Sequence, residues 1–189
     1  MKKIVLLISI IAFTFSVQAQ IGVDATKTYL VTKKDGKPFF WMGDTGWELF
    51  HRLTREEAVH YLNTRQKQGF NVIMAVALAE SNGIRQPNLY GDVPFKNLET
   101  LEWDITPGNN PENAEEYDYW DNVDFVIQEA AKRKLYIGLL PTWGDKVAHS
   151  WGEGPMIFNN SPDGAYAYAK KLAERYKDQW NIIWILGGD

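Results

Sequence analysis

Three largely apolar runs, at residues 72–78, 136–140 and 182–186, constrain the fold of this chain more than any other feature. Runs of this kind are typical of strands that are buried on both faces, as in a parallel sheet flanked by helices. The last run is followed by two glycines and then by Asp189. Because α/β folds place their chemistry at the carboxyl ends of the strands, a functional edge is expected there.

Amphipathic segments lie between these runs. A capping box at residues 54–57 predicts a helix that continues to about residue 68, and apolar residues at helical spacing predict a second helix over 120–134. Pro162 marks the start of a third. The polar segment 79–119 is expected to be a functional loop or an ordinary surface insertion. The residues expected on the buried faces are Ala58, Tyr61 and Leu62 in the first helix, Trp120, Val123, Ile127, Ala130 and Ala131 in the second, and Ala165, Tyr168, Ala169, Leu172 and Tyr176 in the third.

Residues 29–40 are expected to form a β-hairpin. Asp35 and Gly36 stand between two apolar arms, and Asp-Gly is a strong hairpin-turn signal. The second arm is expected to continue through residues 40–42 as the first parallel strand, with residues 43–47 as its loop.

The alternation of strands and helices indicates a parallel sheet with right-handed crossovers. The expected fold is an α/β (β/α)8 TIM barrel, of which this chain supplies about the first four βα units and an N-terminal β-hairpin. A complete barrel has about 250 residues, so we expect the chain to be an N-terminal fragment of a longer enzyme, incomplete and inactive by itself. An open four-stranded sheet is the alternative, but no helix would then cover its fourth strand.

The first 19 residues have the pattern of a secretory signal peptide. A basic start at Lys2 and Lys3 precedes an apolar stretch, and small residues lead to a cleavage site after Ala19. The apolar stretch is shorter than the roughly 18 to 20 residues of a membrane span, so a membrane anchor is the less favoured alternative. We therefore expect an exported protein, periplasmic or extracellular, in which residues 20–189 are the N-terminal part of one catalytic domain.

Composition narrows the classes of partner. The formal net charge is −4 and no basic stripe is present, which argues against nucleic acid and anionic membrane surfaces. The chain contains no cysteine, so a hydrophobic core and not disulfides must stabilise it. It contains eight tryptophans; some are expected in the core, and those near strand ends are suited to stacking on sugar rings. Nothing in the sequence bears on the oligomeric state.

Four carboxylates, those of Asp44, Glu80, Asp145 and Asp189, are expected to meet at the carboxyl edge of the sheet. A Gly-Asp pair closes three of the four strands in this interpretation. Glycoside hydrolysis requires two carboxyl groups, one protonated and one ionised. Asp189 adjoins an apolar strand, so burial is expected to raise its pKa and suit it to the acid role. The alternative is that it caps the next helix.

The further substrate-binding candidates are Asp44, Trp47, Trp143, Asp145, Glu80 and His149. The two tryptophans could line a sugar subsite or pack in the core, and Asp44 could accept hydrogen bonds from sugar hydroxyls or only shape a turn. Of the other histidines, His51 could serve either role and His60, within a helix, is expected to be structural.

Other chemistries have little support. No His-x-His or His-Glu-x-x-His spacing predicts a metal site, and no loop carries a dense Asp-x-Asp pattern for a cation. The Gly-x-Ser-x-Gly motif of esterases and the glycine loops of nucleotide-binding proteins are also missing from the sequence. We therefore expect no cofactor and no metal, with a metal-dependent hydrolase as an alternative that sensitivity to EDTA would favour.

Three segments together are similar to a known family. Residues 40–47 (FWMGDTGW), 141–144 (PTWG) and 183–189 (IWILGGD) resemble the apiosidase-like glycoside hydrolases of family 140, the DUF4038 domain. The similarity extends over essentially all of the chain after the signal peptide. It implies a (β/α)8 barrel, secretion by bacteria that degrade plant material, and cleavage of apiosyl linkages in the pectin rhamnogalacturonan II.

The resemblance also implies a role for one residue. Asp189 matches the catalytic aspartate that follows the fourth strand in this family, and so would be the general acid/base. The partner, a glutamate late in the barrel, has no counterpart within these 189 residues. The expected substrate is a plant cell-wall polysaccharide; a non-catalytic, carbohydrate-binding fragment of the same barrel is the alternative.

Overall fold

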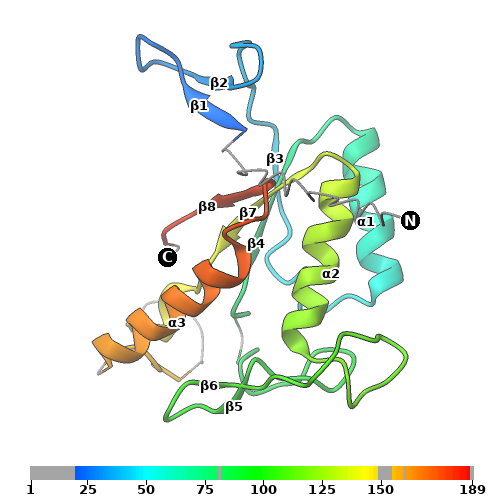
Figure 1. The fold of residues 1–189 in the computed structure, drawn as a ribbon, viewed down its shortest axis with the longest axis vertical. Helices are drawn as coiled ribbons and strands as arrows, with labels where there is room; N and C mark the ends of the chain where they lie inside the picture. The colour runs from blue at the N-terminus through cyan, green and yellow to red at the C-terminus, as the bar shows by residue number, and fades with distance from the viewer. Residues whose placement is uncertain (1–19, 81, 149–154, 160, 188–189) are drawn as a thin grey trace, which may run out of the picture.

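A four-stranded parallel sheet lies at the centre of the fold. The computed structural model describes residues 20–80, 82–148, 155–159 and 161–187; the predicted signal peptide lies outside this range. The strands are β3 (Gly43–Thr45), β4 (Val72–Val76), β7 (Tyr136–Leu140) and β8 (Ile182–Trp184). Figure 1 shows them side by side in the middle of the molecule.

The order of the strands in the sheet, β3-β4-β7-β8, is the same as their order in the chain, and all three pairings are parallel. Each connection between parallel strands therefore leads to the adjacent strand, always toward the same side of the sheet. Right-handed crossovers that all move in one direction place the connecting helices on one face of the sheet. This is the arrangement of an α/β barrel, and it differs from doubly wound sheets, in which the direction reverses. The predicted parallel α/β architecture is confirmed.

Helices connect consecutive strands: α1 (Arg55–Lys67), α2 (Tyr119–Lys132) and α3 (Pro162–Tyr176). The predicted capping box begins α1, where the Thr54 hydroxyl accepts from the backbone N–H of Glu57 and the Glu57 carboxylate accepts from the backbone N–H of Thr54. Such reciprocal bonds satisfy two N–H groups that have no partner within the helix. All three helices begin within two residues of the positions expected from the sequence.

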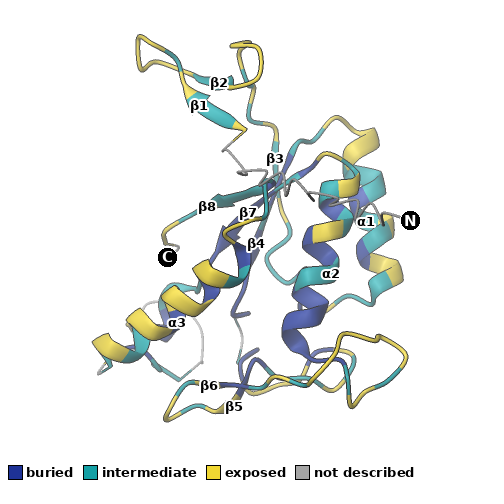
Figure 2. Cartoon of the chain, in the orientation of Figure 1, coloured by how far each residue is buried: buried dark blue, intermediate teal, exposed yellow. Residues whose placement is uncertain are grey.

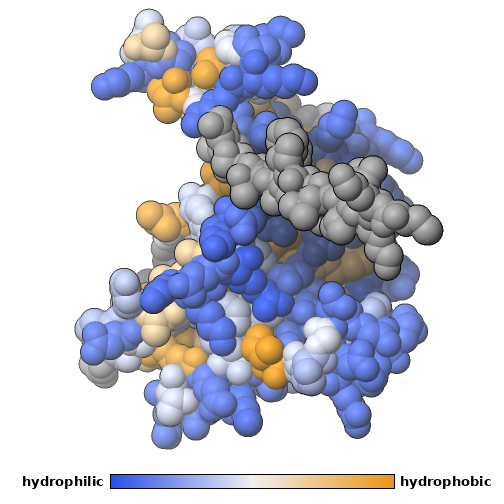
Figure 3. Space-filling view, in the orientation of Figure 1, coloured by the Kyte–Doolittle hydropathy of each residue, from blue (hydrophilic) through white to orange (hydrophobic). Residues whose placement is uncertain are grey.

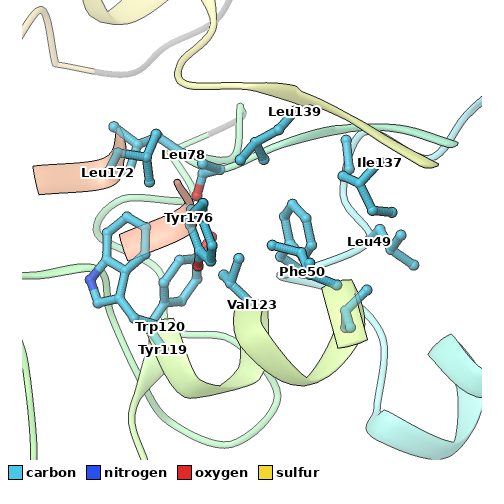
Figure 4. Packing of buried hydrophobic residues seen from close by; sticks show 14 of the residues in the cluster. Leu49, Phe50, Leu78, Tyr119, Trp120, Val123, Ile137, Leu139, Leu172 and Tyr176 are labelled. Carbon is cyan, nitrogen blue, oxygen red and sulfur yellow. The ribbon is translucent and has the colours of Figure 1, made fainter. Parts of the chain in front are cut away.

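One hydrophobic core joins the three helices to the sheet. Ile73 and Ile137 from the strands lie in the same buried cluster as residues of all three helices, and Figure 4 shows side chains of α2 and α3 packed together with Leu139. The buried faces of α1 and α2 are largely as predicted. The prediction for Ala169 is wrong: this residue is exposed on α3, whose outer surface is mostly yellow in Figure 2.

The long segment between β4 and α2 is fixed to this core. It contains a two-stranded antiparallel sheet, β5 (Phe95–Asn97) and β6 (Glu102–Trp103). The Trp103 ring stacks on that of Trp120 with 3.6 Å between centroids, and the Trp120 indole N–H donates to the Pro94 carbonyl at 3.0 Å. The segment is therefore a packed part of the domain and not a loose insertion.

The N-terminal region differs from the predicted hairpin. β2 (Leu30–Thr32) pairs antiparallel with β1 (Ile21–Val23), which the sequence patterns did not indicate. The predicted second arm contributes only an isolated bridge between Val31 and Pro38. The first parallel strand is also later than predicted: it begins at Gly43, and Phe40 is 74% exposed.

The visible surface is mainly hydrophilic. Figure 3 shows hydrophobic side chains in small, separate patches on the face presented. Across the described parts of the chain, no helix has the length and apolar character needed to cross a bilayer.

Candidate active site

The described part of the carboxyl edge of the sheet consists of the loops that follow β3, β4 and β7, together with residues 185–187 after β8. Backbone bonds extend the parallel ladder beyond the strands: Val76 N–H donates to the Trp47 carbonyl at 3.3 Å, and Ala77 N–H donates to the Leu140 carbonyl at 2.8 Å. The first residues of these loops are therefore fixed relative to one another by the sheet itself.

Two predicted residues meet at this edge. The rings of Trp47, after β3, and Trp143, after β7, are 5.0 Å apart between centroids and tilted by 58°. Both residues are half-buried, so each ring has packed and accessible surface. Indole faces of this kind match the C–H faces of sugar rings. The structure therefore brings together the two tryptophans that the sequence suggested for a sugar subsite.

Glu48 forms an ion-pair cluster in the loop after β3. Its Oε2 atom lies 3.2 Å from Nδ1 of His51 and accepts from Nε of Arg52 at 3.1 Å. His51 is 6% exposed, and its Nε2 lies 2.9 Å from the carbonyl of Gln86. The Glu48 carboxylate and the backbone bond to Gln86 raise the pKa of His51 above its ordinary value, although burial opposes them.

Asp145 and Lys146 form a buried pair in the short 3-10 helix η1 (Gly144–Lys146). The Lys146 ammonium donates to both carboxylate oxygens of Asp145, at 2.7 and 2.8 Å. Both side chains are enclosed, so Asp145 has neither a free oxygen nor exposed surface of note. The geometry therefore favours a structural role for Asp145 over the direct substrate contact that we expected.

Glu80 follows β4 and is half-buried. Burial raises the pKa of its carboxyl above the ordinary value, and the charges of Glu48 and Asp145 raise it further. Lys146 and Arg52 act in the opposite direction without cancelling the shift. Glu80 makes no ion pair with any residue of the described ranges, whereas Glu48 and Asp145 at the same edge are both ion-paired.

Asp44 lies within the sheet and not at its carboxyl edge. It pairs with Ile73 within the sheet, so Gly43 and Asp44 form part of β3 and do not close it, contrary to prediction. Its carboxylate accepts from the hydroxyl of Tyr61 at 2.6 Å and from Nε of Arg65, both on α1. The side chain thus faces the helix layer because residues alternate between the two faces of a strand. Asp44 fixes α1 to the sheet and is not part of the edge.

Two predicted residues cannot be placed: Asp189 and His149 lie outside the described residues. His60 is exposed on α1. Sequence reasoning missed Glu48, Arg52 and Lys146, and left His51 open. The spacing of Glu48 to His51 and Arg52, three and four residues, was an available signal, because such positions meet on one side of a helical turn. No group of three or more potential metal ligands is found in the part of the chain that the structure describes.

Comparison with known proteins identifies a family. The family described as "Apiosidase-like, catalytic domain" matches residues 24–189. No curated protein matches the chain.

Solved structures that are similar to this chain are also named as glycoside hydrolases. One named "Glycoside hydrolase" is 40% identical with a TM-score of 0.69, covering 90% of this chain and 34% of that protein. A family 5 glycoside hydrolase from Bacteroides vulgatus ATCC 8482 is 36% identical with a TM-score of 0.69, covering 90% and 33%. An endo-1,4-β-D-mannanase from Thermotoga petrophila RKU-1, 12% identical with a TM-score of 0.55 over 80% and 45%, shares the fold alone. The chain thus spans about a third of the length of the first two structures.

Proposed function

Because the chain belongs to the apiosidase-like family of glycoside hydrolases, we propose that it is part of the catalytic domain of an exported enzyme that cleaves plant cell-wall polysaccharide. The proposed bond is an apiosyl linkage, as in the pectin rhamnogalacturonan II. The longer protein would carry the activity, since this chain matches only 34% and 33% of the first two structures it resembles.

One observation supports the proposal most directly: Trp47 and Trp143 are paired at the carboxyl edge of the sheet, the edge to which the loop of Glu80 also belongs. Aromatic faces suit the apolar faces of a sugar, and a half-buried carboxyl suits its hydroxyls. In α/β barrels the active site is built from the loops at this end of the strands.

In the proposed reaction Asp189 protonates the departing sugar oxygen. In the sequence Asp189 is two residues beyond Gly187 and follows β8, and the proposal requires its side chain at the same edge. A second carboxylate, supplied by a later strand, would act on the other side of the anomeric carbon. The separation of the two carboxyl groups would decide the stereochemistry: about 5 to 5.5 Å for retention and about 6.5 to 9.5 Å for inversion.

The test is hydrolysis by the full-length protein. Apiose-containing oligosaccharides released from rhamnogalacturonan II are incubated with the wild type and with Asp189→Asn, and cleavage is followed by mass spectrometry. The variant should lose about 10³-fold or more in kcat, in the range that general acid–base catalysis contributes, while binding the oligosaccharide as tightly by calorimetry. A near-normal rate in the variant would refute the role of Asp189.

The same assay separates the alternatives. A wild type that binds the oligosaccharide without cleaving it would support a carbohydrate-binding protein. Loss of activity with EDTA would support a metal-dependent hydrolase.

Export is a second part of the proposal. The predicted signal peptide gives a mature protein that begins at Gln20. Intact-mass analysis of protein from the periplasm or culture medium would detect this N-terminus, and a retained Met1 would contradict it.

A further inference from the structure

Glu48, His51 and Gln86 connect two edge loops that are distant in sequence. Glu48 and His51 belong to the loop after β3, and Gln86 to the segment after β4 that also contains Glu80. His51 contacts both: Nδ1 lies 3.2 Å from Glu48 Oε2, and Nε2 lies 2.9 Å from the Gln86 carbonyl. We call this set of contacts the Glu48–His51–Gln86 clasp.

The two hydrogen-bond partners of the His51 ring indicate its protonation state. A carboxylate and a carbonyl are both acceptors, so each ring nitrogen must donate to satisfy its contact. Neutral imidazole has one N–H, whereas imidazolium has two. The Glu48 carboxylate favours the cation and the Arg52 guanidinium opposes it. His51 is 6% exposed, so water cannot readily replace either partner.

The clasp is closely connected to Glu80. The backbone N–H of Gly83 donates to the Glu80 carbonyl at 3.0 Å, and that of Gln86 donates to the Asn82 carbonyl at 3.0 Å. Between them Ile84 is buried in the core. These bonds make residues 82–86 a compact series of turns that is hydrogen-bonded to the Glu80 carbonyl, so the position of Glu80 depends on that of Gln86.

Glu48 adds an electrostatic connection. One of its oxygens contacts His51 and Arg52, and its charge is among the causes that raise the pKa of Glu80. The other oxygen, Oε1, is buried and has no hydrogen-bond partner among the described residues. Glu48 is half-buried, and its charged end therefore lies beside His51 on one side and Arg52 on the other.

We propose that His51, as an imidazolium, is a positioning residue of the active site: it joins the loop after β3 to the loop after β4 and thereby holds Glu80 and the charge of Glu48 in place. The effect on turnover rests on the proposed function, through the contact of Glu80 with substrate. The proposal that His51 joins the two loops is independent of the proposed function.

The first test is structural and uses the full-length protein. Hydrogen–deuterium exchange is compared between the wild type and His51→Gln, in which glutamine donates to only one of the two acceptors. Amides of residues 82–92 should exchange about tenfold faster, the factor expected for loss of one charged hydrogen bond, while amides of α1 should not change. His60→Gln, at an exposed position on α1, is the matched control and should leave both regions as in the wild type.

The second test is kinetic. With apiose-containing oligosaccharides, His51→Gln should raise KM about tenfold and change kcat by less than about threefold, because a displaced Glu80 weakens binding more than chemistry. In the wild type, kcat/KM should decline as the pH rises through the pKa of His51. The part of this decline that is due to His51 should be missing in His51→Gln and retained in His60→Gln, whereas the decline that is due to deprotonation of the general acid should remain in both variants.

The outcomes distinguish the two proposals. If the wild type cleaves none of these oligosaccharides, the proposed function fails, and the exchange experiment still decides whether the clasp exists. Unchanged exchange in His51→Gln would overturn the clasp. Faster exchange with an unchanged KM and an unchanged alkaline decline would make His51 a structural residue and overturn its positioning role.

Discussion

Lys146 forms its ion pair with Asp145, its own neighbour in the chain, through two bonds of 2.7 and 2.8 Å, and the Lys146 side chain is 0% exposed. Adjacent side chains usually diverge; here the 3-10 turn of η1 brings them together. A buried pair of this kind neutralises charge at the edge of the sheet without offering either group to solvent. It follows that the two residues depend on one another for burial.

Removal of the lysine alone should be costly. Lys146→Met should lower the free energy of unfolding by about 3 to 5 kcal/mol, because the Asp145 carboxylate is left buried without a partner. The measurement is urea unfolding at pH 7. Lys170→Met, which removes an exposed pair with Glu174, should cost no more than about 1 kcal/mol. Equal effects of the two variants would show that the buried pair is not coupled.

Loss of one edge tryptophan should weaken binding. Trp143→Ala removes one member of the ring pair and should raise the dissociation constant for the oligosaccharide about tenfold, in line with the loss of one aromatic stacking contact. Calorimetry on the full-length protein measures it. Tyr166→Ala, on the outer surface of α3 where the ring is 70% exposed, is the matched aromatic control. Unchanged affinity in Trp143→Ala would show that the Trp143 ring packs within the protein and does not bind the sugar.

Asp44 should matter for stability and not for substrate. Burial raises its pKa, but the hydrogen bonds from Tyr61 and Arg65 outweigh burial and hold the pKa below its ordinary value. Asp44→Asn should therefore lower the free energy of unfolding by about 1.5 to 3 kcal/mol at pH 7. A lowered pKa stabilises the folded state above the unfolded pKa of about 4. The difference between wild type and variant should thus shrink as the pH falls below that value.

Urea unfolding at several pH values measures this difference. A rise in KM for Asp44→Asn beyond about twofold, more than loss of stability explains, would instead place Asp44 among the substrate-binding residues.

Glu80 should show the opposite relation between pH and stability. Its pKa is raised, chiefly by burial, so the ionised form is disfavoured in the folded protein and stability is lost as the pH rises through that pKa. Glu80→Gln should raise the urea midpoint at pH 7 but not at pH 4, and should increase KM. Glu174→Gln on the surface of α3 should shift neither. A lower midpoint for Glu80→Gln at pH 7 would contradict the assignment.

The parallel strands and their helices could be predicted because local signals and burial agree there. The run over β7 gave its exact bounds, and the capping box at Thr54 gave the start of α1. The N-terminal region was harder: the Asp35-Gly36 turn is present, but its first arm forms a strand with β1 and only an isolated bridge with the predicted second arm. Short strands carry little periodicity, so the choice of partner depends on tertiary contacts.

Only part of the site could be predicted from the sequence, for a related reason. Trp47 and Trp143 could be placed at one edge because they follow predicted parallel strands. Asp44 was misplaced because β3 begins three residues later than the apolar pattern suggested, and an error of this size moves a side chain from one level of the sheet to another. Glu48 and Lys146 were missed because their significance lies in partners that only the folded chain brings near.

The contact between Trp47 and Trp143 passes over a strand to which neither belongs. β4 lies between β3 and β7, and strands two places apart are about 10 Å from one another, yet the ring centroids are 5.0 Å apart. The two indoles therefore lean toward one another across the end of β4. A sugar that stacks on this pair would lie over the end of a strand that contributes neither ring, so the backbone at the end of β4 forms the floor beneath it.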